Sequence, residues 1–569
     1  MAIPNSIDRR TSPVVIAWIV LALAWLSAGM FDREPWKADE AYTFGMVLTM
    51  VDGGSLVVPT LGGEPFLEKP PLVFWLAAGT AKALAPIMPL HAGARLANVL
   101  LSLATFLFTW LAARLAFGGP ARSAPASAAA DGRSSGVLAT GGAAMDCDRR
   151  AIDAVLILAG CPTWLLASRY LTADLGLVMA AAVVAYALVN LQQQRRWAGA
   201  WLGIATAAGL LSKGLLFPGV VVLCMLVLIT TAVPFRNRYA IGQYGWAVAI
   251  GLVASSIWPA LLAKESPQLL HTWLWDNNVG RFLGLNALGP DNNRLALAGQ
   301  VVLFLLPALP LAVAALVRQG RGWRHSTLYP PAVFCGTWIS AVLMSSTARI
   351  IYILPVLAPL ALVAAGFTAR WAEQRRIAWT RAVLIAAALL AVAAIVTKLV
   401  LFWRDPLSRW GSATSVAPGE LALAGAAAVA LLILIRSAIA GRPAAIWAGG
   451  LTFAWVLALA LFLRPADQTT GFKALFTELG RAVPAGAPCI ASRALGESER
   501  GLLEYYARLR TVRAEVDPTA MVRCPLRIEQ ERTVDRGRLG CGNLNQIWSG
   551  SRPEDRSNLF RLCAAPGLP

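Results

Sequence analysis

Long apolar stretches recur along this chain, separated by short polar or charged segments. A helix needs ~20 mostly apolar residues to cross the hydrocarbon core of a bilayer, and such windows recur from residue 13 to residue 464. The pattern predicts thirteen membrane spans, two of which (198–212 and 329–345) are short enough for a tilted or partly re-entrant arrangement. The predicted spans are 13–31, 95–117, 151–168, 174–191, 198–212, 214–233, 242–263, 295–317, 329–345, 350–369, 382–402, 420–437 and 443–464.

Composition supports a membrane protein. The 569 residues are 57% hydrophobic and only 14% charged, and they include 21 tryptophans, which is outside the usage of soluble globular proteins. The first apolar stretch is too long for a cleaved signal sequence and no A-x-A site follows it, so we expect it to be a retained span.

The distribution of arginine predicts the orientation, because Lys and Arg gather in short cytoplasmic loops. Arginine clusters occur near the ends of alternate spans, whereas the loop 32–71 carries seven acidic residues against three basic ones. With an odd number of spans, we expect a cytoplasmic N-terminus and a periplasmic C-terminus. The net charge of +19 then reflects this topology and affinity for anionic membrane lipids, and no nucleic-acid motif is present. The clusters are Arg9 and Arg10; Arg122, Arg133, Arg149 and Arg150; Arg195 and Arg196; Arg236 and Arg238; Arg318, Arg321 and Arg324; Arg370, Arg375 and Arg376; Arg436 and Arg442.

The chain divides into two predicted domains. Residues 1–465 form a transmembrane domain that includes the loop 32–71 with interfacial helices, and residues 466–569 form a soluble periplasmic domain. In the latter, 496–515 reads as an amphipathic helix beside strand-like runs at 488–495 and 559–565. The Gly/Ser/Ala-rich segment 118–150 reads as a flexible cytoplasmic loop.

Four cysteines fall in the predicted periplasmic domain, where an oxidising compartment permits two disulfides. Sequence alone leaves three pairings open. The four are Cys489, Cys524, Cys541 and Cys563.

Ionisable residues at the outer ends of spans are the functional candidates, because a charge at the centre of a membrane helix costs about 2.5–3.5 kcal/mol. Each also has a simpler explanation: acidic residues can solvate an interfacial helix, and lysine or arginine can extend to the headgroups. Their convergence on one face nevertheless favours a site at the membrane surface. The candidates are Asp39, Glu40, Glu68, Lys69, Arg169, Asp174, Lys213, Arg281, Arg349 and Tyr352.

The order of these motifs carries a family resemblance. "DE" follows the first span, "EKPP" ends the first outer loop, and "RYLTAD", "LSKG", "NNVGRF" and "SSTARIIYILP" follow in turn. Essentially the whole chain resembles the GT-C glycosyltransferases that use polyprenyl-phosphate sugars, most closely the bacterial 4-amino-4-deoxy-L-arabinose lipid A transferases. Arg349 stands where relatives often carry lysine, which keeps the charge but replaces a point contact with a planar fork.

The resemblance implies an activity. The expected reaction is the inverting transfer of 4-amino-4-deoxy-L-arabinose from undecaprenyl phosphate to a lipid A phosphate. It takes place at the periplasmic face of the bacterial inner membrane. The modified lipid A confers resistance to polymyxin and other cationic antimicrobial peptides. The fold implied is a polytopic α-helical GT-C membrane protein with a C-terminal α/β periplasmic domain.

The resemblance also implies residue roles. Lys69, Arg281 and Arg349 neutralise the departing polyprenyl phosphate, Tyr352 donates a hydrogen bond to it, and Lys213 orients a phosphate. Asp39, Glu40 and Asp174 form the catalytic group, in which Asp39 positions the acceptor or the sugar amine and Asp174 contacts the amine. Glu68 orients Lys69, or binds a divalent metal with His271; no cofactor is required.

Two other functions stay open from sequence. A protein O-mannosyltransferase would use the same fold with Asp39 as the base, and a lipid transporter or flippase would show internal repeats and charges near the midplane.

Overall fold

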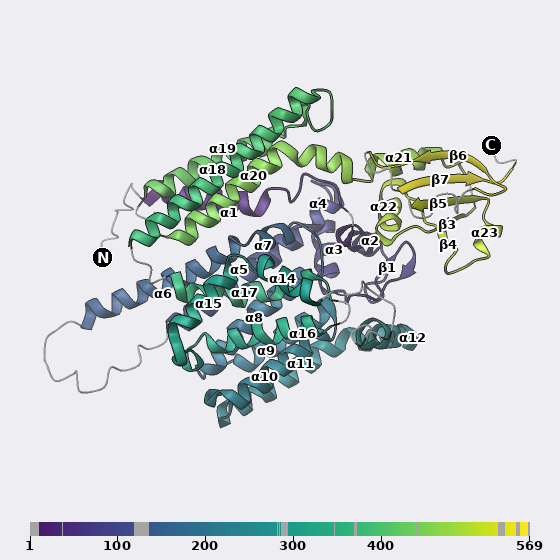
Figure 1. The fold of residues 1–569 in the computed structure, drawn as a ribbon. Coiled ribbons are helices and arrows are strands. Elements are labelled where there is room, and N and C mark those ends of the chain that lie inside the picture. Colours follow the sequence, from purple (N-terminus) through teal and green to yellow (C-terminus); the bar gives the residue numbers. More distant parts are fainter. Residues whose placement is uncertain are drawn as a thin grey trace, which may run out of the picture.

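The computed structural model is a helical bundle that ends in a small α/β unit (Figure 1). It describes residues 11–36, 38–118, 136–280, 283, 285, 294–345, 348–368, 373–437, 442–486, 488–532, 541–553 and 558–566. The chain begins in the bundle, and the C-terminus lies beyond the sheet at the opposite end of the molecule.

The helices of the bundle follow the predicted apolar segments. Each of the thirteen predicted segments overlaps at least one helix. The helices are α1 (Thr11–Ser27), α5 (Leu96–Phe117), α6 (Gly136–Ala159), α7 (Pro162–Ala167), α8 (Asp174–Gln192), α9 (Ala198–Lys213), α10 (Leu216–Thr231), α11 (Arg238–Glu265), α12 (Pro267–His271), α14 (Arg294–Phe304), α15 (Ala308–Gln319), α16 (Tyr329–Met344), α17 (Leu357–Thr368), α18 (Glu373–Arg404), α19 (Pro418–Arg436) and α20 (Pro443–Thr470).

Short helical turns connect several of these helices. A π-helix, η3, covers Thr272–Gly280, and the turns of 3₁₀ helix are η2 (Val233–Phe235), η4 (Gly320–His325), η5 (Ile350–Val356) and η6 (Ala413–Ser415).

The predicted number of spans is not confirmed. In the described part of the chain, seven helices are long and apolar enough to cross a membrane, or eight if α14 and α15, which meet at a bend of 84°, form one span. Helices α1, α10 and α16 are apolar but shorter. The apolar segments of the sequence therefore predicted where the helices lie. They also led us to expect more helices of full membrane-spanning length than the structure contains in its described part.

One loop prediction is wrong in part. Residues 136–150, expected to be flexible, form more than half of α6. Ion pairs stabilise this extension, because Arg150 lies 2.6 Å from Asp146 one turn earlier and Arg114 of α5 lies 2.9 Å from Asp148. The preceding residues 119–135 lie outside the described part of the chain.

Helix α8 lies at the centre of the bundle. Its sequence is rich in alanine and valine, and almost every residue from Asp174 to Leu191 is buried. It packs against α5, α9 and α16, because small side chains allow the backbones of membrane helices to approach closely.

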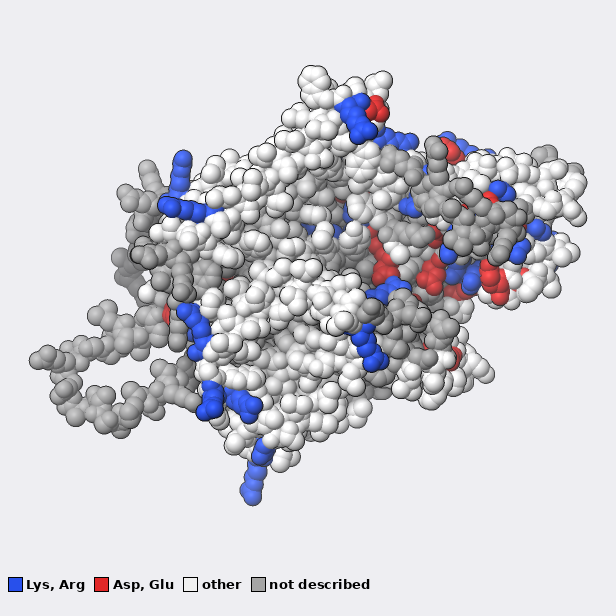
Figure 2. All heavy atoms as spheres, viewed as in Figure 1, with Lys and Arg blue, Asp and Glu red and all other residues white. Residues whose placement is uncertain are grey.

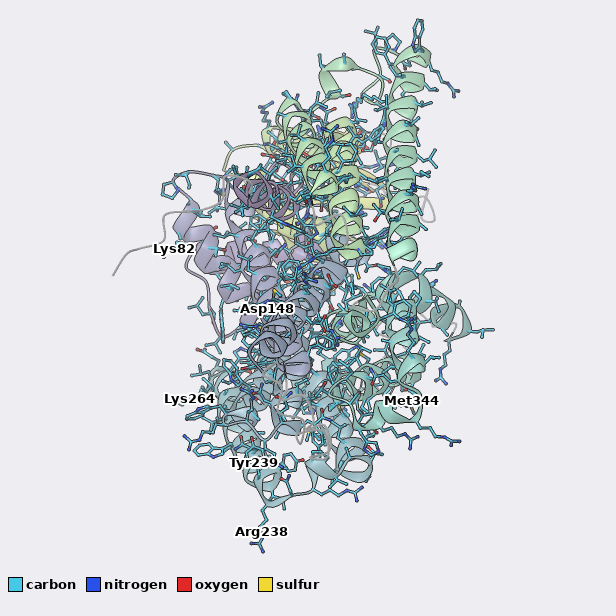
Figure 3. All side chains as sticks on the ribbon, turned by 90° about the vertical axis from the view of Figure 1, so that its left-hand side faces the viewer. Lys82, Asp148, Arg238, Tyr239, Lys264 and Met344 are labelled. Carbon is cyan, nitrogen blue, oxygen red and sulfur yellow. A yellow bond between two sulfur atoms is a disulfide. The ribbon has the colours of Figure 1, made fainter. Side chains whose placement is uncertain are left out.

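A second layer consists of α1, α18, α19 and α20. Helix α1 packs on α19, and α20 packs on both α18 and α19. The two ribbon views agree that α18–α20 lie on one side of the bundle and the α9–α11 region on the other (Figures 1 and 3).

The loop 32–71 contains α2 (Asp39–Val51) and a two-stranded hairpin of β1 (Thr60–Leu61) and β2 (Glu64–Pro65), and it is followed by α3 (Leu72–Leu84) and α4 (Leu90–Ala94). The sequence predicted interfacial helices here. Helix α2 is covered by protein from Glu40 to Met50, because it lies between α3 and a helix of the C-terminal unit, α22 (Glu497–Ala507); its position at the membrane interface stays a prediction.

The C-terminal unit is a five-stranded sheet with strand order β4-β3-β5-β7-β6. Strands β4, β3 and β5 are parallel, and β5, β7 and β6 are antiparallel. The predicted strand-like runs coincide with β3 and β7, and the predicted amphipathic helix contains α22. The elements are α21 (Lys473–Ala482), β3 (Ile490–Arg493), α22, β4 (Val512–Arg513), α23 (Ala520–Arg523), β5 (Leu526–Arg532), β6 (Asn545–Gly550) and β7 (Asn558–Ala564).

The structure selects one of the three disulfide pairings. Cys489 is bonded to Cys524 and Cys541 to Cys563. The first bond joins the residue before β3 to the residue two positions before β5, and the second joins β7 to the segment that precedes β6. Both bonds therefore link neighbouring strands of the sheet.

Charge is distributed unevenly over the surface. A broad area of the helices carries no charged side chain on the face in Figure 2, and acidic side chains gather where the bundle meets the C-terminal unit. Lysine and arginine border the opposite end of the bundle on that face.

Candidate active site

Two cavities lie on either side of a hydrogen bond between Lys69 and Tyr42. Lys69 lines the first cavity, which has a volume of about 440 Å³. Tyr42 and Asp39 line the second, of about 520 Å³. Because Lys69 Nζ donates to Tyr42 OH, one bonded pair of side chains connects the walls of the two cavities.

The first cavity is mainly apolar and carries two lysines. Residues Phe217, Val220 and Leu223 of α10 contribute an apolar wall at helical spacing, and α16 contributes Trp338. Lys69, Lys213, Glu68 and Tyr352 are among its polar lining residues. We name it the apolar cavity.

Lys213 is positioned by the end of α9. Helix α9 stops at Gly214, which has a φ of +90°, and a Cβ at this position would lie 2.1 Å from Asn278 Oδ1. The same oxygen accepts a hydrogen bond from Leu215 N at 2.9 Å. The "LSKG" motif thus requires glycine both for its backbone conformation and for its contact with Asn278.

The ammonium of Lys213 lies between two elements. It pairs with Asp174, the first residue of α8, and lies 3.8 Å from the centre of the Tyr352 ring. Tyr352 is held in place by its carbonyl oxygen, which accepts from Trp338 Nε1 at 2.8 Å. These contacts bring four segments together at one point of the cavity wall.

The second cavity is polar and lies between α2, the β1–β2 hairpin and the C-terminal unit. Its charged lining residues come from both sides of this junction: Asp39, Glu64, Arg349, Glu497, Glu499, Arg500, Arg513 and Arg532. We name it the junction cavity.

Asp39 is ionised at neutral pH. Burial raises its pKa, but Lys69, a hydrogen bond from Tyr42 OH at 3.0 Å, Lys213 and Arg349 together hold it below its usual range. The half-exposed Arg349 approaches Asp39 Oδ1 to 4.0 Å. Asp39 therefore presents a stable negative charge beside the junction cavity.

Lys69 stays cationic although it is buried. Burial lowers its pKa, but the surrounding Tyr42, Glu68, Asp39 and Asp174 outweigh that effect and raise it. An anionic ligand in the apolar cavity would thus meet the charged ammonium group of Lys69.

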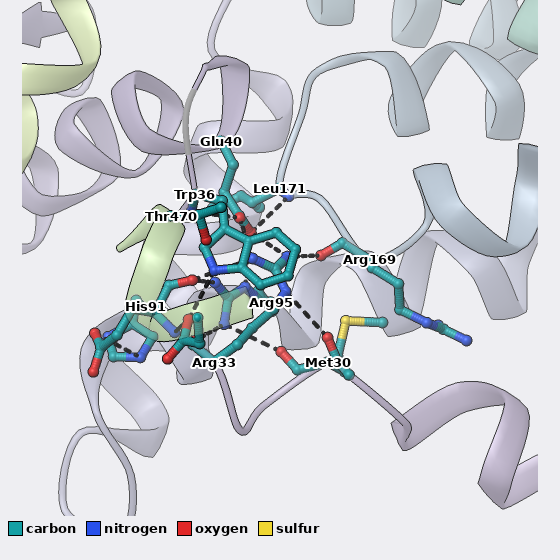
Figure 4. Close-up of polar contacts among 12 residues, drawn as sticks. Met30, Arg33, Trp36, Glu40, His91, Arg95, Arg169, Leu171 and Thr470 are labelled. Carbon is teal, nitrogen blue, oxygen red and sulfur yellow. Dashed lines mark hydrogen bonds and ion pairs between the residues drawn. The ribbon is translucent and has the colours of Figure 1, made fainter. Parts of the chain in front are cut away.

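Glu40 occupies a different place from its neighbour Asp39. Its carboxylate accepts from Arg33 at 2.5 and 2.9 Å and from Arg95 Nε at 2.8 Å, and from the backbone N–H groups of Trp36 and Leu171 (Figure 4). Burial raises its pKa, but the two arginines lower it to about 2. Predicted as catalytic, Glu40 lines neither cavity and instead fixes α2 to α5 and to the segment before α8.

Sequence analysis did not select Tyr42 as a site residue, although the structure places it between Asp39 and Lys69. Tyr42 follows Asp39 by three residues, and this spacing puts both side chains on one face of a helix, where they can form a hydrogen bond.

Two further predicted site residues are Arg281 and His271. Arg281 lies outside the described residues. His271 is exposed on α12, and no group of three or more His, Cys, Asp or Glu side chains suitable for a metal occurs in the described part of the chain. Glu68 lines the apolar cavity, and a divalent metal held by Glu68 and His271 stays a prediction.

The chain has the GT-C fold of polytopic membrane proteins. The chain superposes on the solved structure of ArnT from Cupriavidus metallidurans bound to undecaprenyl phosphate with a TM-score of 0.71, over 97% of this chain and 98% of that one, at 16% sequence identity. The structure of the same protein in its apo state gives the same values. The predicted fold class is confirmed, apart from the number of helices that span the membrane.

Sequence comparison identifies particular relatives. The chain is 27% identical over 184 residues to an undecaprenyl phosphate-alpha-4-amino-4-deoxy-L-arabinose arabinosyl transferase of Sodalis glossinidius, covering 31% of this chain and 32% of that protein. A transferase of the same name from Yersinia pestis is 27% identical over 190 residues, covering 32% and 33%. The chain therefore matches about a third of the length of these curated relatives. No protein-family model matches, and the resemblance predicted from the motifs is confirmed.

Proposed function

We propose that this chain transfers 4-amino-4-deoxy-L-arabinose from undecaprenyl phosphate to a phosphate of lipid A. The observation that carries the proposal is the apolar cavity with Lys69, Lys213 and Tyr352 in its wall. A polyprenyl phosphate has an apolar tail and an anionic head, and this cavity offers complementary surfaces to both. The names of the sequence relatives and of the superposed structure support the same donor.

The reaction is a single displacement at the anomeric carbon. An acceptor phosphate oxygen attacks C1 from the face opposite the donor phosphate, and the bond between C1 and the donor oxygen breaks. Its electron pair leaves with undecaprenyl phosphate, so the configuration at C1 inverts. Lys69 and Lys213 stabilise the charge that grows on the departing phosphate, because they lie in a partly desolvated wall.

Asp39 has an electrostatic and positioning role. An acceptor phosphate is already ionised near neutral pH, so no strong general base is needed. The carboxylate lies beside the junction cavity and holds Tyr42 and, through it, Lys69. Arg349, at the edge of the same cavity, is available to neutralise a phosphate.

The proposed location is the bacterial inner membrane. The chain is a multi-span membrane protein with the fold described above; we propose that its N-terminus is cytoplasmic and that 466–569 form a periplasmic domain. The arginine-rich loops and the pair of disulfides in the sheet support this orientation.

Mass spectrometry of lipid A tests the proposal. Cells that express the chain are expected to add an aminopentose to lipid A and to resist polymyxin, whereas cells without the gene are not. Asp39→Ala and Lys69→Ala are expected to abolish the added mass while the protein still accumulates in the membrane. Unmodified lipid A in cells with abundant wild-type protein would contradict the proposal, and glycosylated protein in such cells would favour the O-mannosyltransferase instead.

A further inference from the structure

We propose that Glu497, in the C-terminal unit, binds the ammonium group of the donor sugar and makes the enzyme selective for a cationic pentose. This inference rests on the proposed function. It assigns a substrate contact to a part of the chain that is separate in sequence from the helical bundle.

The C-terminal unit is attached to helix α2, which carries Asp39. Ser498 Oγ donates to the carbonyl oxygen of Ala38 at 3.0 Å, which ties the start of α22 to the start of α2. The two helices cross at Gly45 and Gly501, where a Cβ on Gly45 would lie 2.8 Å from the Cα of Gly501. Glu497, the first residue of α22, therefore lines the junction cavity together with Asp39.

Other carboxylates around the two cavities already have partners. Glu64 accepts from Arg500 and Arg513, each at 3.0 Å. Asp174 pairs with Lys213, which leaves it less suited to the sugar amine than the sequence indicated.

Asp39 is likewise engaged, since it accepts from Tyr42. Glu497, in contrast, forms no hydrogen bond or ion pair with any residue that the structure describes. It is accessible within the cavity, so its carboxylate is available to a ligand.

The electrostatic environment of Glu497 favours a cationic ligand. Burial and the nearby Glu68 raise the pKa of its carboxyl group, and Asp39 adds to this, against the opposing effect of Arg500 and Lys69. An ammonium group bound there would offset both the desolvation and the repulsion between carboxylates. A neutral hydroxyl at the same position of the sugar would offset neither.

The test compares two donors with purified full-length protein in lipid vesicles. One donor is undecaprenyl phosphate bearing 4-amino-4-deoxy-L-arabinose, and the other bears L-arabinose, with a hydroxyl in place of the amine. Glu497→Gln is expected to lower kcat/KM for the amino donor by about tenfold or more, the typical effect of losing a hydrogen bond between charged groups. The value for the neutral donor is expected to stay unchanged.

A control on the same helix separates recognition from folding. Glu504→Gln removes a carboxylate that pairs with Arg510 at 2.6 Å and does not line the cavity, so it should preserve the ratio between the donors. If the wild type uses the amino donor, two results for Glu497→Gln would overturn this inference alone. One is an equal loss of kcat/KM for both donors, and the other is no loss of kcat/KM for either donor. A wild type that transfers only neutral arabinose would overturn the proposed function and this inference with it.

Discussion

At the scale of single residues, the site depends on side chains that hold one another. Tyr42 OH accepts from Lys69 and donates to Asp39, and its ring packs 5.5 Å from Phe66. The hydroxyl therefore couples the cation of the apolar cavity to the carboxylate of the junction cavity, while the ring supplies packing.

Tyr42→Phe separates these two roles. We expect the transfer rate to fall by roughly 10- to 100-fold, because a hydrogen bond to a charged group contributes about 1.5–3 kcal/mol. The melting temperature should change little, since the ring remains. Steady-state kinetics and thermal unfolding of the same preparation measure both; a wild-type rate would show that Asp39 and Lys69 are held without the hydroxyl.

Glu40 provides a prediction about stability and pH. Its pKa is lowered from 4.5 to about 2 in the folded chain, so its ionised form stabilises the fold above pH 4.5. That contribution is lost as the pH falls from about 4.5 toward 2. Glu40→Gln leaves Arg33 and Arg95 without their shared carboxylate, so it should lower the free energy of unfolding by about 3–5 kcal/mol. It should also remove this part of the loss of stability at low pH.

The measurement is the melting temperature in detergent between pH 3 and 7, for wild type and variant (roughly the range of the carboxyl titration). Asp52→Asn is the control, because Asp52 is exposed and lies 3.5 Å from the exposed Arg508; such pairs contribute about 0–1 kcal/mol. Equal melting curves for Glu40→Gln and Asp52→Asn would contradict the role of Glu40.

At the scale of elements, two glycines set the distance between α2 and α22. A Cβ at Gly45 would lie 2.5 Å from Leu61 Cδ1 as well as 2.8 Å from the backbone of Gly501. The contact brings the C-terminal unit close enough to contribute half of the junction cavity.

Gly45→Ala should therefore separate the two helices. We expect a loss of about 1–3 kcal/mol in stability through overpacking and a lower transfer rate, because Glu497 and Ser498 move away from Asp39. Gly79→Ala is the matched control: Gly79 is exposed on α3 with open space around its Cβ position, so alanine should be neutral or stabilising there. Equal activity of the two variants would show that the spacing of α2 and α22 is not critical.

At the scale of the whole molecule, the disulfides and the arginine-rich loops support the same proposed orientation, with the C-terminal unit in the periplasm. Both disulfides belong to the C-terminal sheet, whereas the free cysteines Cys147, Cys161, Cys224 and Cys335 belong to the bundle. Oxidised cysteines persist on the periplasmic side of a bacterial membrane and not in the cytoplasm.

Peptide mapping under non-reducing conditions should recover Cys489 linked to Cys524 and Cys541 linked to Cys563. In intact cells, a membrane-impermeant thiol reagent should leave Cys147 unlabelled until the inner membrane is opened. Labelling of Cys147 from outside, or reduced cysteines in the sheet, would place the C-terminal unit in the cytoplasm and contradict the proposed orientation.

Sequence determined the features that depend on local pattern. The length of apolar runs located the helices, and the placement of ionisable residues at their outer ends selected Asp39, Lys69, Asp174, Lys213 and Tyr352. In the structure, Lys69, Lys213 and Tyr352 line the apolar cavity, Asp39 lines the junction cavity, and Asp174 pairs with Lys213. Both inferences were possible because the bilayer acts on each segment separately, through apolar length and the cost of charge.

Only the tertiary structure decided which neighbours meet. Asp39 and Glu40 are adjacent in sequence, but successive residues of a helix point about 100° apart; one faces the junction cavity and the other is enclosed by Arg33 and Arg95. Likewise, the contact between Gly45 and Gly501 and the cysteine pairing depend on residues far apart in the chain. No local pattern encodes such contacts, because they arise from the packing of complete elements.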